Sequence, residues 1–327
     1  DVAGELQVTR SDGTFEGVTL GVDTTLVTGA VVTVTNDLLL DNATLTLSRG
    51  GGYNASDEID LRFSGGSQLL GGTGVVELSN RYSSASEDRL ARIRPTDGAT
   101  LTIGENITVQ TTADSHFTTL GDPTLPLVIE GTVISQSEEA SRDVLRITGS
   151  VVTNNGNLQV DSGELDVDGL DTVLGEVDIN GGNLDLDGSY VINQPVTVPA
   201  GSLTLRGDWT NSSTIDQTGG TINLLDTFLV SDLGTFTGTG GTVIIGGTLD
   251  DPGATLRIDS ERSWQISGGT LRGGAAPNRL RIADDGDGDA AGALEGTSSD
   301  GAFDGVTLGV DTTLVTGAIV TVTNDLL

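Results

Sequence analysis

The sequence predicts an all-β protein that folds as a parallel β-helix (β-solenoid) with coils of about 19–21 residues. Three observations support this fold class. Val, Leu, Ile and Thr are set between frequent glycines, short runs alternate strictly between apolar and polar residues, and an apolar pattern recurs at a constant spacing. No long stretch places apolar residues at the helical spacing of i, i+3, i+4 and i+7.

The recurring pattern contains three series of positions that share one period. Glycines at successive spacings of 19, 19, 19 and 21 each precede an alternating strand: Gly163, Gly182, Gly201, Gly220 and Gly241. A second, apolar series has the same spacings: Leu158, Val177, Val196, Ile215 and Phe236. A third is aromatic: Tyr190, Trp209 and Phe228. A shared period with one shared insertion indicates coils stacked in register, whereas the strands of a β-sandwich do not recur at one constant spacing.

The alternation also predicts which side chains face the interior. Leu165 and Val167 point inward, while Asp166 and Asp168 point outward, because successive side chains of a strand face opposite sides. The glycines are expected at corners, where φ becomes positive. The aromatic column could form a stack in the core or an outward ladder that binds carbohydrate. Its residues lie on the same side of the strand as neighbouring apolar residues, which favours the core. We expect the β-helix to be right-handed.

A second repeat is much longer. Residues 1–39 align without a gap to residues 289–327, with 31 identities in 39 at an offset of 288. We therefore expect residues 1–288 to form one full tandem repeat as a continuous β-solenoid, with irregular coils and surface loops over 48–98. Residues 289–327 then begin the next copy. The absence of Met and the start at Asp1 indicate a processed product or a part of a longer chain.

Composition excludes several functions. The chain has 47 acidic and 15 basic residues, all of the latter Arg, and a net charge of −32, which repels nucleic acid and anionic lipid. No stretch approaches the roughly 18 apolar residues of a membrane span. The absence of Cys excludes disulfides, thiol catalysis and Cys-based metal sites.

Two groups of carboxylates suggest cation binding. At a 19-residue period Asp166 stacks on Asp185 and Asp168 on Asp187, and calcium could bridge such pairs; an ion pair to Arg206 is the alternative. The second group is a Gly-interrupted acidic loop at the junction between copies: Asp284, Asp285, Asp287 and Asp289. It lacks the twelfth-position glutamate of an EF-hand loop, and a solvated acidic loop without an ion remains the alternative. Calcium is thus the one cofactor the sequence suggests.

Catalytic candidates are few. The single histidine, His116, is expected to be an ordinary surface residue, and its neighbour Ser115 is not placed as a nucleophile is to its base. Polysaccharide hydrolases with a right-handed β-helix are similar to one another in Asn-Thr-Asp, Gly-His-Gly and Arg-Ile-Lys motifs; the second and third are absent here. We therefore expect no enzymatic activity.

The Gly- and Thr-rich coils contain short segments such as Leu70-Gly-Gly-Thr-Gly-Val-Val-Glu-Leu78 and Gly268-Gly-Thr-Leu271. In style they resemble the β-helical stalks of giant bacterial surface proteins, the filamentous-haemagglutinin-like and autotransporter-passenger-like adhesins. The resemblance implies an extracellular structural segment, a filament, stalk or adhesin scaffold, with copies joined end to end and surface glycans or other cells as partners. The alternative is a carbohydrate-binding or polysaccharide-cleaving β-helix.

Overall fold

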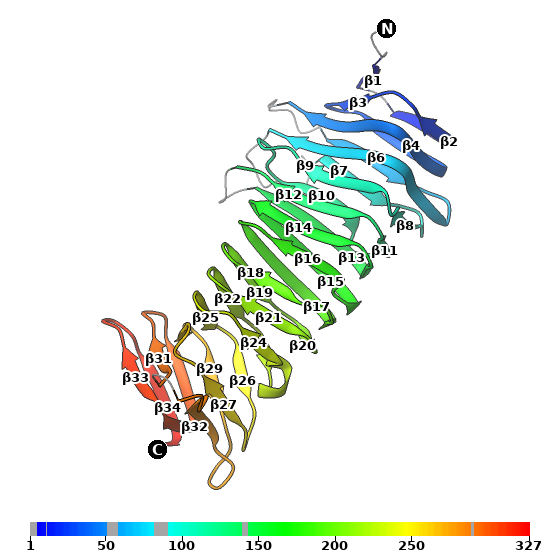
Figure 1. Cartoon of the computed structure of the whole chain (residues 1–327). Coiled ribbons are helices and arrows are strands. Elements are labelled where there is room, and N and C mark those ends of the chain that lie inside the picture. Colours follow the sequence, from blue (N-terminus) through cyan, green and yellow to red (C-terminus); the bar gives the residue numbers. More distant parts are fainter. Residues whose placement is uncertain (1–4, 11, 51–57, 82–90, 139–142, 289–290) are drawn as a thin grey trace. The chain divides into compact units, whose positions relative to one another are not determined.

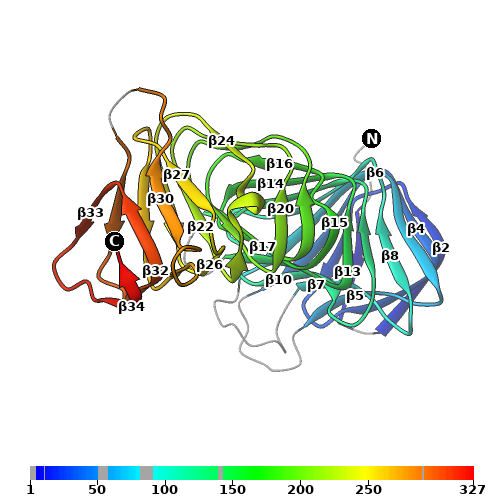
Figure 2. The same cartoon turned by 90° about the horizontal axis from the view of Figure 1, so that it is seen from below.

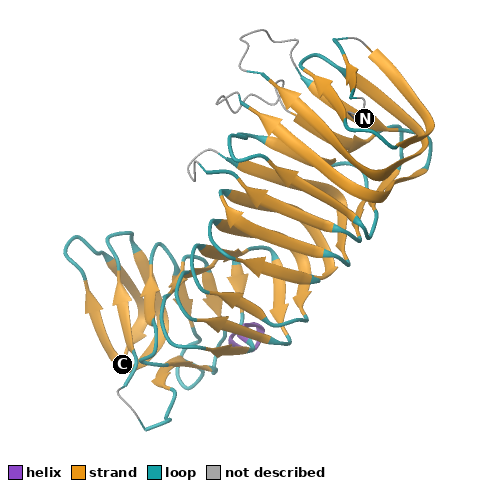
Figure 3. Cartoon of the chain, turned by 45° about the horizontal axis from the view of Figure 1, so that its top comes forward, coloured by secondary structure: helices purple, strands orange, loops and turns teal. Residues whose placement is uncertain are grey.

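The structure is a computed structural model that describes residues 5–10, 12–50, 58–81, 91–138, 143–288 and 291–327. It divides into two compact units, Asp1–Asp185 and Leu186–Leu327. The described elements are almost entirely β-strands, with one 3-10 turn, η1 (Val230–Leu233) (Figure 3). The prediction of an all-β protein is therefore confirmed.

Within the described ranges, the first unit contains sixteen strands and the start of a seventeenth. They are β1 (Leu6–Val8), β2 (Asp12–Leu20), β3 (Thr24–Val27), β4 (Val31–Arg49), β5 (Ile59–Phe63), β6 (Ser67–Asn80), β7 (Ala91–Pro95), β8 (Thr100–Ile103), β9 (Ile107–Thr111), β10 (Thr118–Asp122), β11 (Leu127–Ile129), β12 (Thr132–Gln136), β13 (Val144–Asn154), β14 (Asn157–Ser162), β15 (Glu164–Val173), β16 (Glu176–Ile179) and β17 (Asn183–Ile192). The division between the units falls inside β17.

The second unit continues with shorter strands. They are β18 (Val196–Val198), β19 (Ser202–Leu205), β20 (Asp208–Asn211), β21 (Thr214–Gln217), β22 (Thr221–Leu224), β23 (Thr227–Phe228), β24 (Thr235–Thr237), β25 (Thr242–Ile245), β26 (Thr248–Asp250), β27 (Thr255–Ile258), β28 (Ser263–Ile266), β29 (Thr270–Arg272), β30 (Leu280–Asp284), β31 (Ala293–Gly296), β32 (Gly301–Gly309), β33 (Asp311–Leu314) and β34 (Val320–Leu326).

Strand pairing in the first unit is parallel and forms three ladders (Figure 1). One ladder runs β1–β3–β4–β6–β9–β12–β14–β16, and a second runs β2–β4–β5–β7–β10–β13–β15. The third joins the remaining segments of β4 and β6 to β8, β11, β13 and β15. The long strands serve two ladders because they continue through a corner.

The second unit repeats this arrangement (Figure 2). One ladder runs β19–β22–β25–β28–β31–β33, and another runs β23–β26–β29–β32–β34. The third consists of two parts, β18–β21–β24 and β27–β30–β32. Leu203 faces Ile222, and Ile222 in turn faces Val243, so the register follows the two spacings that the sequence predicts.

The interior is built from the inward residues of these ladders. Leu165, Leu184, Leu203 and Ile222 are each fully buried, whereas Asp166 and Asp168 between their neighbours are only half-buried. Tyr190 faces Trp209, whose ring stacks on Phe228 with centroids 5.9 Å apart, and all three are 2% exposed. The predicted core position of the aromatic column is therefore confirmed. The stacked Trp209–Phe228 pair adds about 0.5–1.5 kcal/mol beyond the burial of its area.

The corners need glycine and asparagine. The predicted corner glycines at 163, 182, 201 and 220 all have φ between +60° and +72°, a region that costs other residues about 1–2 kcal/mol. Two buried asparagines secure turns in the same way. The Asn154 side chain accepts from Gly156 N and donates to Leu174 O, and the Asn211 side chain accepts from Ser213 N and donates to Leu233 O. Each side chain thus satisfies a buried carbonyl one coil further along.

The spacing of paired strands is longer over 48–98. On adjacent strands Leu45 faces Val76 and Leu61 faces Ile93, so paired strands lie further apart in sequence here than in the regular region. The additional residues lie between strands, where segments 51–57 and 82–90 fall outside the described residues.

The two homologous segments form the same strands in the same register. In residues 1–39, Leu6 faces Thr24 and Gly13 faces Val32. At the offset of 288, Leu294 faces Thr312 and Gly301 faces Val320. The register shifts at the same place in both, between Glu16 and Val18 in one and between Asp304 and Val306 in the other.

Candidate functional site

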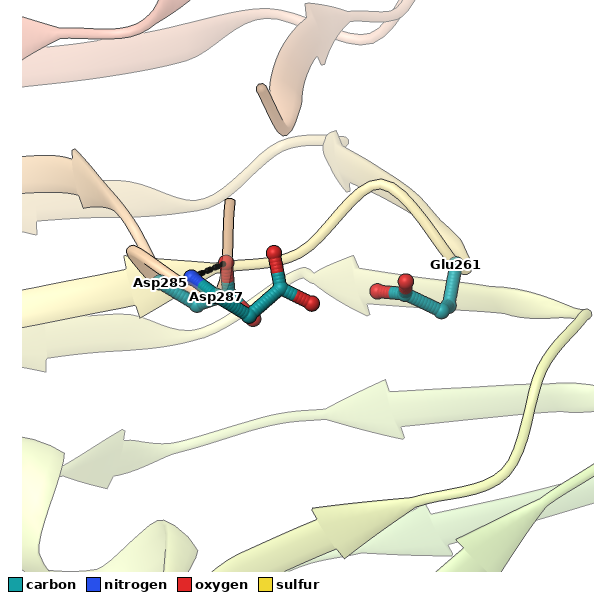
Figure 4. Close-up of side chains that lie close together, drawn as sticks. All are labelled: Glu261, Asp285 and Asp287. Carbon is teal, nitrogen blue, oxygen red and sulfur yellow. Dashed lines mark hydrogen bonds between the residues drawn. The ribbon is translucent and has the colours of Figure 1, made fainter. Parts of the chain in front are cut away.

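A cluster of three carboxylates lies at the acidic loop predicted from sequence. Oxygens of Glu261, Asp285 and Asp287 all lie within 4.8 Å of one another (Figure 4). Asp285 also accepts a hydrogen bond from the backbone N of Asp287, at 3.4 Å. This is the one group of three potential metal-ligating side chains that the described ranges bring together.

Stacking of the ladders explains why Glu261 belongs to this cluster. Glu261 lies in the loop between β27 and β28, and the acidic loop lies between β30 and β31. Because β27 pairs with β30 and β28 with β31, the two loops follow neighbouring strands of the same ladders. Sequence reasoning missed Glu261 because paired strands lie further apart in sequence here, with Leu256 facing Ile282 and Trp264 facing Leu294. The regular period therefore does not connect the two loops.

The other residues of this loop have separate roles. The Asp284 carboxylate accepts from the backbone N of Gly286 and of Gly292, so it supports the loop rather than the cluster. Arg257 donates to the carbonyl oxygen of Asp284 at 3.0 Å, which places a positive charge beside the loop. Asp289, the fourth predicted ligand, lies outside the described residues.

The predicted Asp166–Asp185 and Asp168–Asp187 carboxylate columns lie beside an arginine, Arg146. Arg146 lies directly opposite Asp166 on the adjacent strand and donates to its carboxylate at 2.9 Å. The same guanidinium is 3.6 Å from the Asp168 carboxylate. Asp185 and Asp187 both lie on β17, half-buried, on either side of the division between the units. An Arg residue thus neutralises part of this column from β13.

A second charged cluster surrounds Asp60 on β5. Its fully buried side chain lies opposite Arg92 and accepts from Arg94 at 2.7 Å and from Arg62 at 2.6 Å. Glu58 pairs with Arg92 and lies 3.5 Å from Arg62. Arg92 and Arg94 thus lie on β7, and Arg89 lies outside the described residues.

The pKa values in this cluster follow from these contacts. Burial acts to raise the pKa of Asp60, but hydrogen bonds from Arg94 and Arg62 outweigh it and hold that pKa below its ordinary value. The hydrogen bond to Asp60 raises the pKa of Arg94. Burial acts to raise the pKa of Asp122, but hydrogen bonds that its carboxylate accepts from Thr124, together with the charge of Arg94, hold that pKa below its ordinary value.

His116 is less exposed than its sequence context suggests. Its Nδ1 lies 2.6 Å from Oδ1 of Asp143, whose side chain is 1% exposed, while the His116 side chain is 15% exposed. Ser115 is buried, and its hydroxyl accepts from the backbone N of Asn80. The expectation of an ordinary surface histidine is therefore wrong, because the coil that follows places Asp143 against its ring.

The chain matches no protein-family model, and no curated protein or solved structure is significantly similar to it. Within the part of the chain that the structure describes, no helix is long and apolar enough to cross a membrane.

Proposed function

We propose that this chain is a structural segment of a giant extracellular tandem-repeat protein, a filament, stalk or adhesin scaffold on a bacterial cell surface. In this proposal the strands wind as a right-handed parallel β-helix, and each copy, here residues 1–288, continues directly into the next. The chain acts mechanically and not as an enzyme, and its partners are neighbouring copies and surface glycans or other cells.

The observation that carries the proposal is the shared register of the two homologous segments. Pairing at Leu6–Thr24 and Gly13–Val32 recurs at Leu294–Thr312 and Gly301–Val320. A copy that keeps its pairing in a second context behaves as a modular unit, as the coils of solenoid proteins do. The acidic composition supports the same reading, because like charge keeps exposed β faces of neighbouring molecules apart.

In the proposed β-helix, the order of the strands gives the advance of one copy. Strand segments along the chain would occupy the three ladders in turn, with long strands such as β4 and β13 supplying more than one segment each. On this proposal β30 takes the same position of the coil as β1, twelve turns further along the chain. β31, the counterpart of β1, comes one strand later and pairs with β28. One copy therefore corresponds to twelve and one-third turns, or about 59 Å at about 4.8 Å per turn. Successive copies present the same sequence on successive faces, and the fourth copy returns to the first face.

Cross-linking tests this winding directly, because the chain has no Cys of its own. Gln265 lies opposite Glu295, and their side chains hydrogen-bond at 3.2 Å. Oxidation of the Gln265→Cys/Glu295→Cys variant should yield a disulfide, because adjacent strands place Cα atoms within the bridging range of about 4.4–6.8 Å. The control, Arg281→Cys/Glu295→Cys, pairs Glu295 with a residue of another ladder and should remain reduced. Equal cross-linking of both variants contradicts the winding.

The mechanical function has its own test. A chain that carries three copies should form a single filament in which electron cryo-microscopy resolves an axial advance of about 59 Å per copy. Traced density should show the counterparts of β1 in three different ladders. A compact particle, or copies that separate as beads with no continuous strand pairing, would contradict the proposal.

A further inference from the structure

Two pairs of strands, one pair in each unit, have an edge without a described partner. β1 pairs with β3 and β2 pairs with β4, and the other edges of β1 and β2 have no partner among the described residues. Likewise β33 pairs with β31 and β34 with β32, and the described ranges supply no second partner for either. These are the β1–β2 edge of the first unit and the β33–β34 edge of the second. An unpaired edge presents backbone N–H and C=O groups that can pair with another strand.

Equivalent strands are paired on these same edges elsewhere in the chain. The counterparts of β33 and β34 at the offset of 288 are β3 and the first part of β4, which pair on that edge with residues 45–48 and with β5. The counterparts of β1 and β2 are β31 and β32, which pair on that edge with β28 and with β29 and β30. Both unpaired edges therefore belong to sequences that accept a further strand.

Apolar side chains that belong to the interior are exposed at both edges. At the β33–β34 edge Leu314, Val322 and Leu326 are between 38% and 51% exposed, although the equivalent residues of the first copy are fully buried. At the β1–β2 edge Leu6 is 42% exposed, although its counterpart is 1% exposed, and Phe15 is half-buried. Exposed apolar residues that lie together on paired strands mark an interaction surface.

The two edges match each other in register. Within one chain β1 and β2 pair with β3 and β4, and β33 and β34 repeat the sequence of those two partners. The same register between two molecules brings together apolar inward residues: Val8 and Leu314, Phe15 and Val322, and Val18 and Leu326. It also brings together outward residues with at most one charge in each pair: Gln7 and Thr313, Thr14 and Thr321, and Glu16 and Thr323. No carboxylate in these pairs therefore faces another carboxylate.

We propose that the β33–β34 edge of one molecule binds the β1–β2 edge of a second copy, so that separate chains join head to tail through parallel strand pairing. The docking rests on the proposed function, because both edges must continue the same winding, and it extends that function from copies within one chain to separate molecules. The two partners use different surfaces, so the contact can repeat from molecule to molecule. The net charge of −32 opposes association, and added salt screens that repulsion.

Sedimentation equilibrium of the whole chain tests the docking. Because only two strands of each molecule take part, we expect single chains at about 1 µM and association towards about 1 mM. Association should be stronger at about 0.5 M salt than at about 0.05 M salt. A chain that stays single over this whole range of concentration and salt overturns the proposal.

Single substitutions assign the association to the two edges. Leu6→Asp and Leu314→Asp each place a charge in one edge, and each should abolish the association of that variant with itself. Leu229→Asp is the matched control, because Leu229 is 42% exposed, as Leu6 is, and lies on neither edge. This control should associate as the unchanged chain does, and thermal unfolding shows that all three variants remain folded. An equal loss in Leu229→Asp contradicts the assignment.

A mixture of the two edge variants shows the direction of the contact. Each variant keeps one intact edge, and the two intact edges are complementary, so an equimolar mixture of Leu6→Asp and Leu314→Asp should form dimers and nothing larger. Dimers of either variant alone would show that an edge pairs with itself, which overturns the head-to-tail contact.

A disulfide between molecules tests the register. A Gln7→Cys chain mixed with a Thr313→Cys chain should form a mixed disulfide on oxidation, because residues opposite each other on adjacent strands lie within the bridging range of about 4.4–6.8 Å between Cα atoms. Thr321→Cys is the control partner for Gln7→Cys, because it lies on β34 and should remain reduced. Equal cross-linking to both partners contradicts the register.

The docking and the proposed function fail in different ways. The Gln265→Cys/Glu295→Cys disulfide forms within one chain, so its formation in a chain that does not associate overturns the docking alone. Loss of that disulfide as well would overturn the winding on which the docking rests.

Discussion

Residues 1–39 and 289–327 have nearly the same sequence and the same strand pairing, but their side chains are buried in opposite order. Leu6 is 42% exposed and its counterpart Leu294 is 1% exposed. Further along each segment the relation reverses: Leu26 is fully buried, whereas its counterpart Leu314 is 51% exposed. Register is thus a property of the repeated segment itself, and burial is a property of the neighbouring coils.

The neighbours that make the difference are identified by the pairing. Residues Thr24–Val27 are covered by the segment of β4 at 45–48, and Val31–Val34 by β5. β31 is covered on its other side by β28. The burial of each strand therefore depends on the strands paired with it on both sides, which is why the energetic cost of one substitution depends on the copy in which it is made.

The largest effect should come from Leu26→Ala. Removing a fully buried Leu leaves a cavity, which costs about 3 kcal/mol of unfolding free energy. The same substitution in the other copy, Leu314→Ala, should cost less than about 0.5 kcal/mol, because that side chain is half exposed. Denaturant unfolding of the two variants measures the difference.

A longer chain sharpens this comparison. When residues 40–80 are appended after Leu327, they supply the strands that cover Leu26 in the first copy, and Leu314→Ala should then cost about 3 kcal/mol as well. A scrambled extension is the control. Equal costs of Leu26→Ala and Leu314→Ala in the present chain would show that burial does not decide the effect.

Asp60→Asn tests β5, the strand that covers Val31–Val34 of the first copy. Asp60 lies opposite Val31, whose counterpart Ile319 is 61% exposed. Removing the carboxylate leaves Arg62 and Arg94 without their shared partner, and we expect a loss of about 2 kcal/mol at pH 7, reduced because both guanidinium groups are partly exposed.

The pH dependence gives this effect a signature. The folded-state pKa of Asp60 is lowered, so its contribution is complete above the unfolded value of about 3.9 and is lost as pH falls through the lower folded value. The difference between wild type and Asp60→Asn should be constant above about pH 5 and shrink below about pH 4. A difference that grows on acidification would contradict the assigned ion pairs.

Two equivalent glycines allow the cost of backbone strain to be distinguished from the cost of steric overlap. Gly17 and Gly305 occupy the same bulge with φ +57° and +65°, so alanine strains both by about 1 kcal/mol. The added Cβ at 17 meets nothing closer than Asn36 O at 3.6 Å, whereas at 305 it would overlap the carbonyl oxygen of Gly274. Gly305→Ala should therefore cost about 1 kcal/mol more than Gly17→Ala in thermal or denaturant unfolding. Equal costs would mean that strain alone decides.

The sequence predicted those parts of the fold that follow from a strict period. Leu165, Leu184, Leu203 and Ile222 are buried and the aromatic column lies in the core, because alternation and a regular coil fix both direction and register. Where the coils lengthen, the period fails. The longer step that places Arg92 opposite Asp60 has no counterpart in the regular region, so their pairing could not be derived.

Less of the candidate sites could be predicted, because the spacing of paired strands is irregular around them. Asp285 and Asp287 stood out as an acidic loop, but Glu261 joins them across coils of irregular length. Asp143 lies beside His116 across a longer step of 27 residues, whereas Arg146 lies 20 residues before Asp166, within the predicted spacing. Arg92 and Arg146 lie on either side of Thr119 on β10, a neighbourhood that only the register reveals.

The smallest expected effect concerns calcium at the junction that precedes the second copy. Oxygens that bind one calcium ion at about 2.3–2.6 Å lie at most about 5 Å apart, and those of Glu261, Asp285 and Asp287 lie within 4.8 Å. At free calcium three times the dissociation constant, binding should stabilise the chain by about 0.8 kcal/mol. Thermal unfolding with and without calcium measures this shift, and Glu261→Gln or Asp287→Asn should remove it. Asp166→Asn is the control, because its carboxylate is paired with Arg146 and should leave the calcium effect unchanged. A calcium effect lost in Asp166→Asn and kept in Glu261→Gln would move the ion from the junction to the column on β15. No effect in any variant would leave the acidic loop as solvated charge, stabilised by its own backbone hydrogen bonds and Arg257.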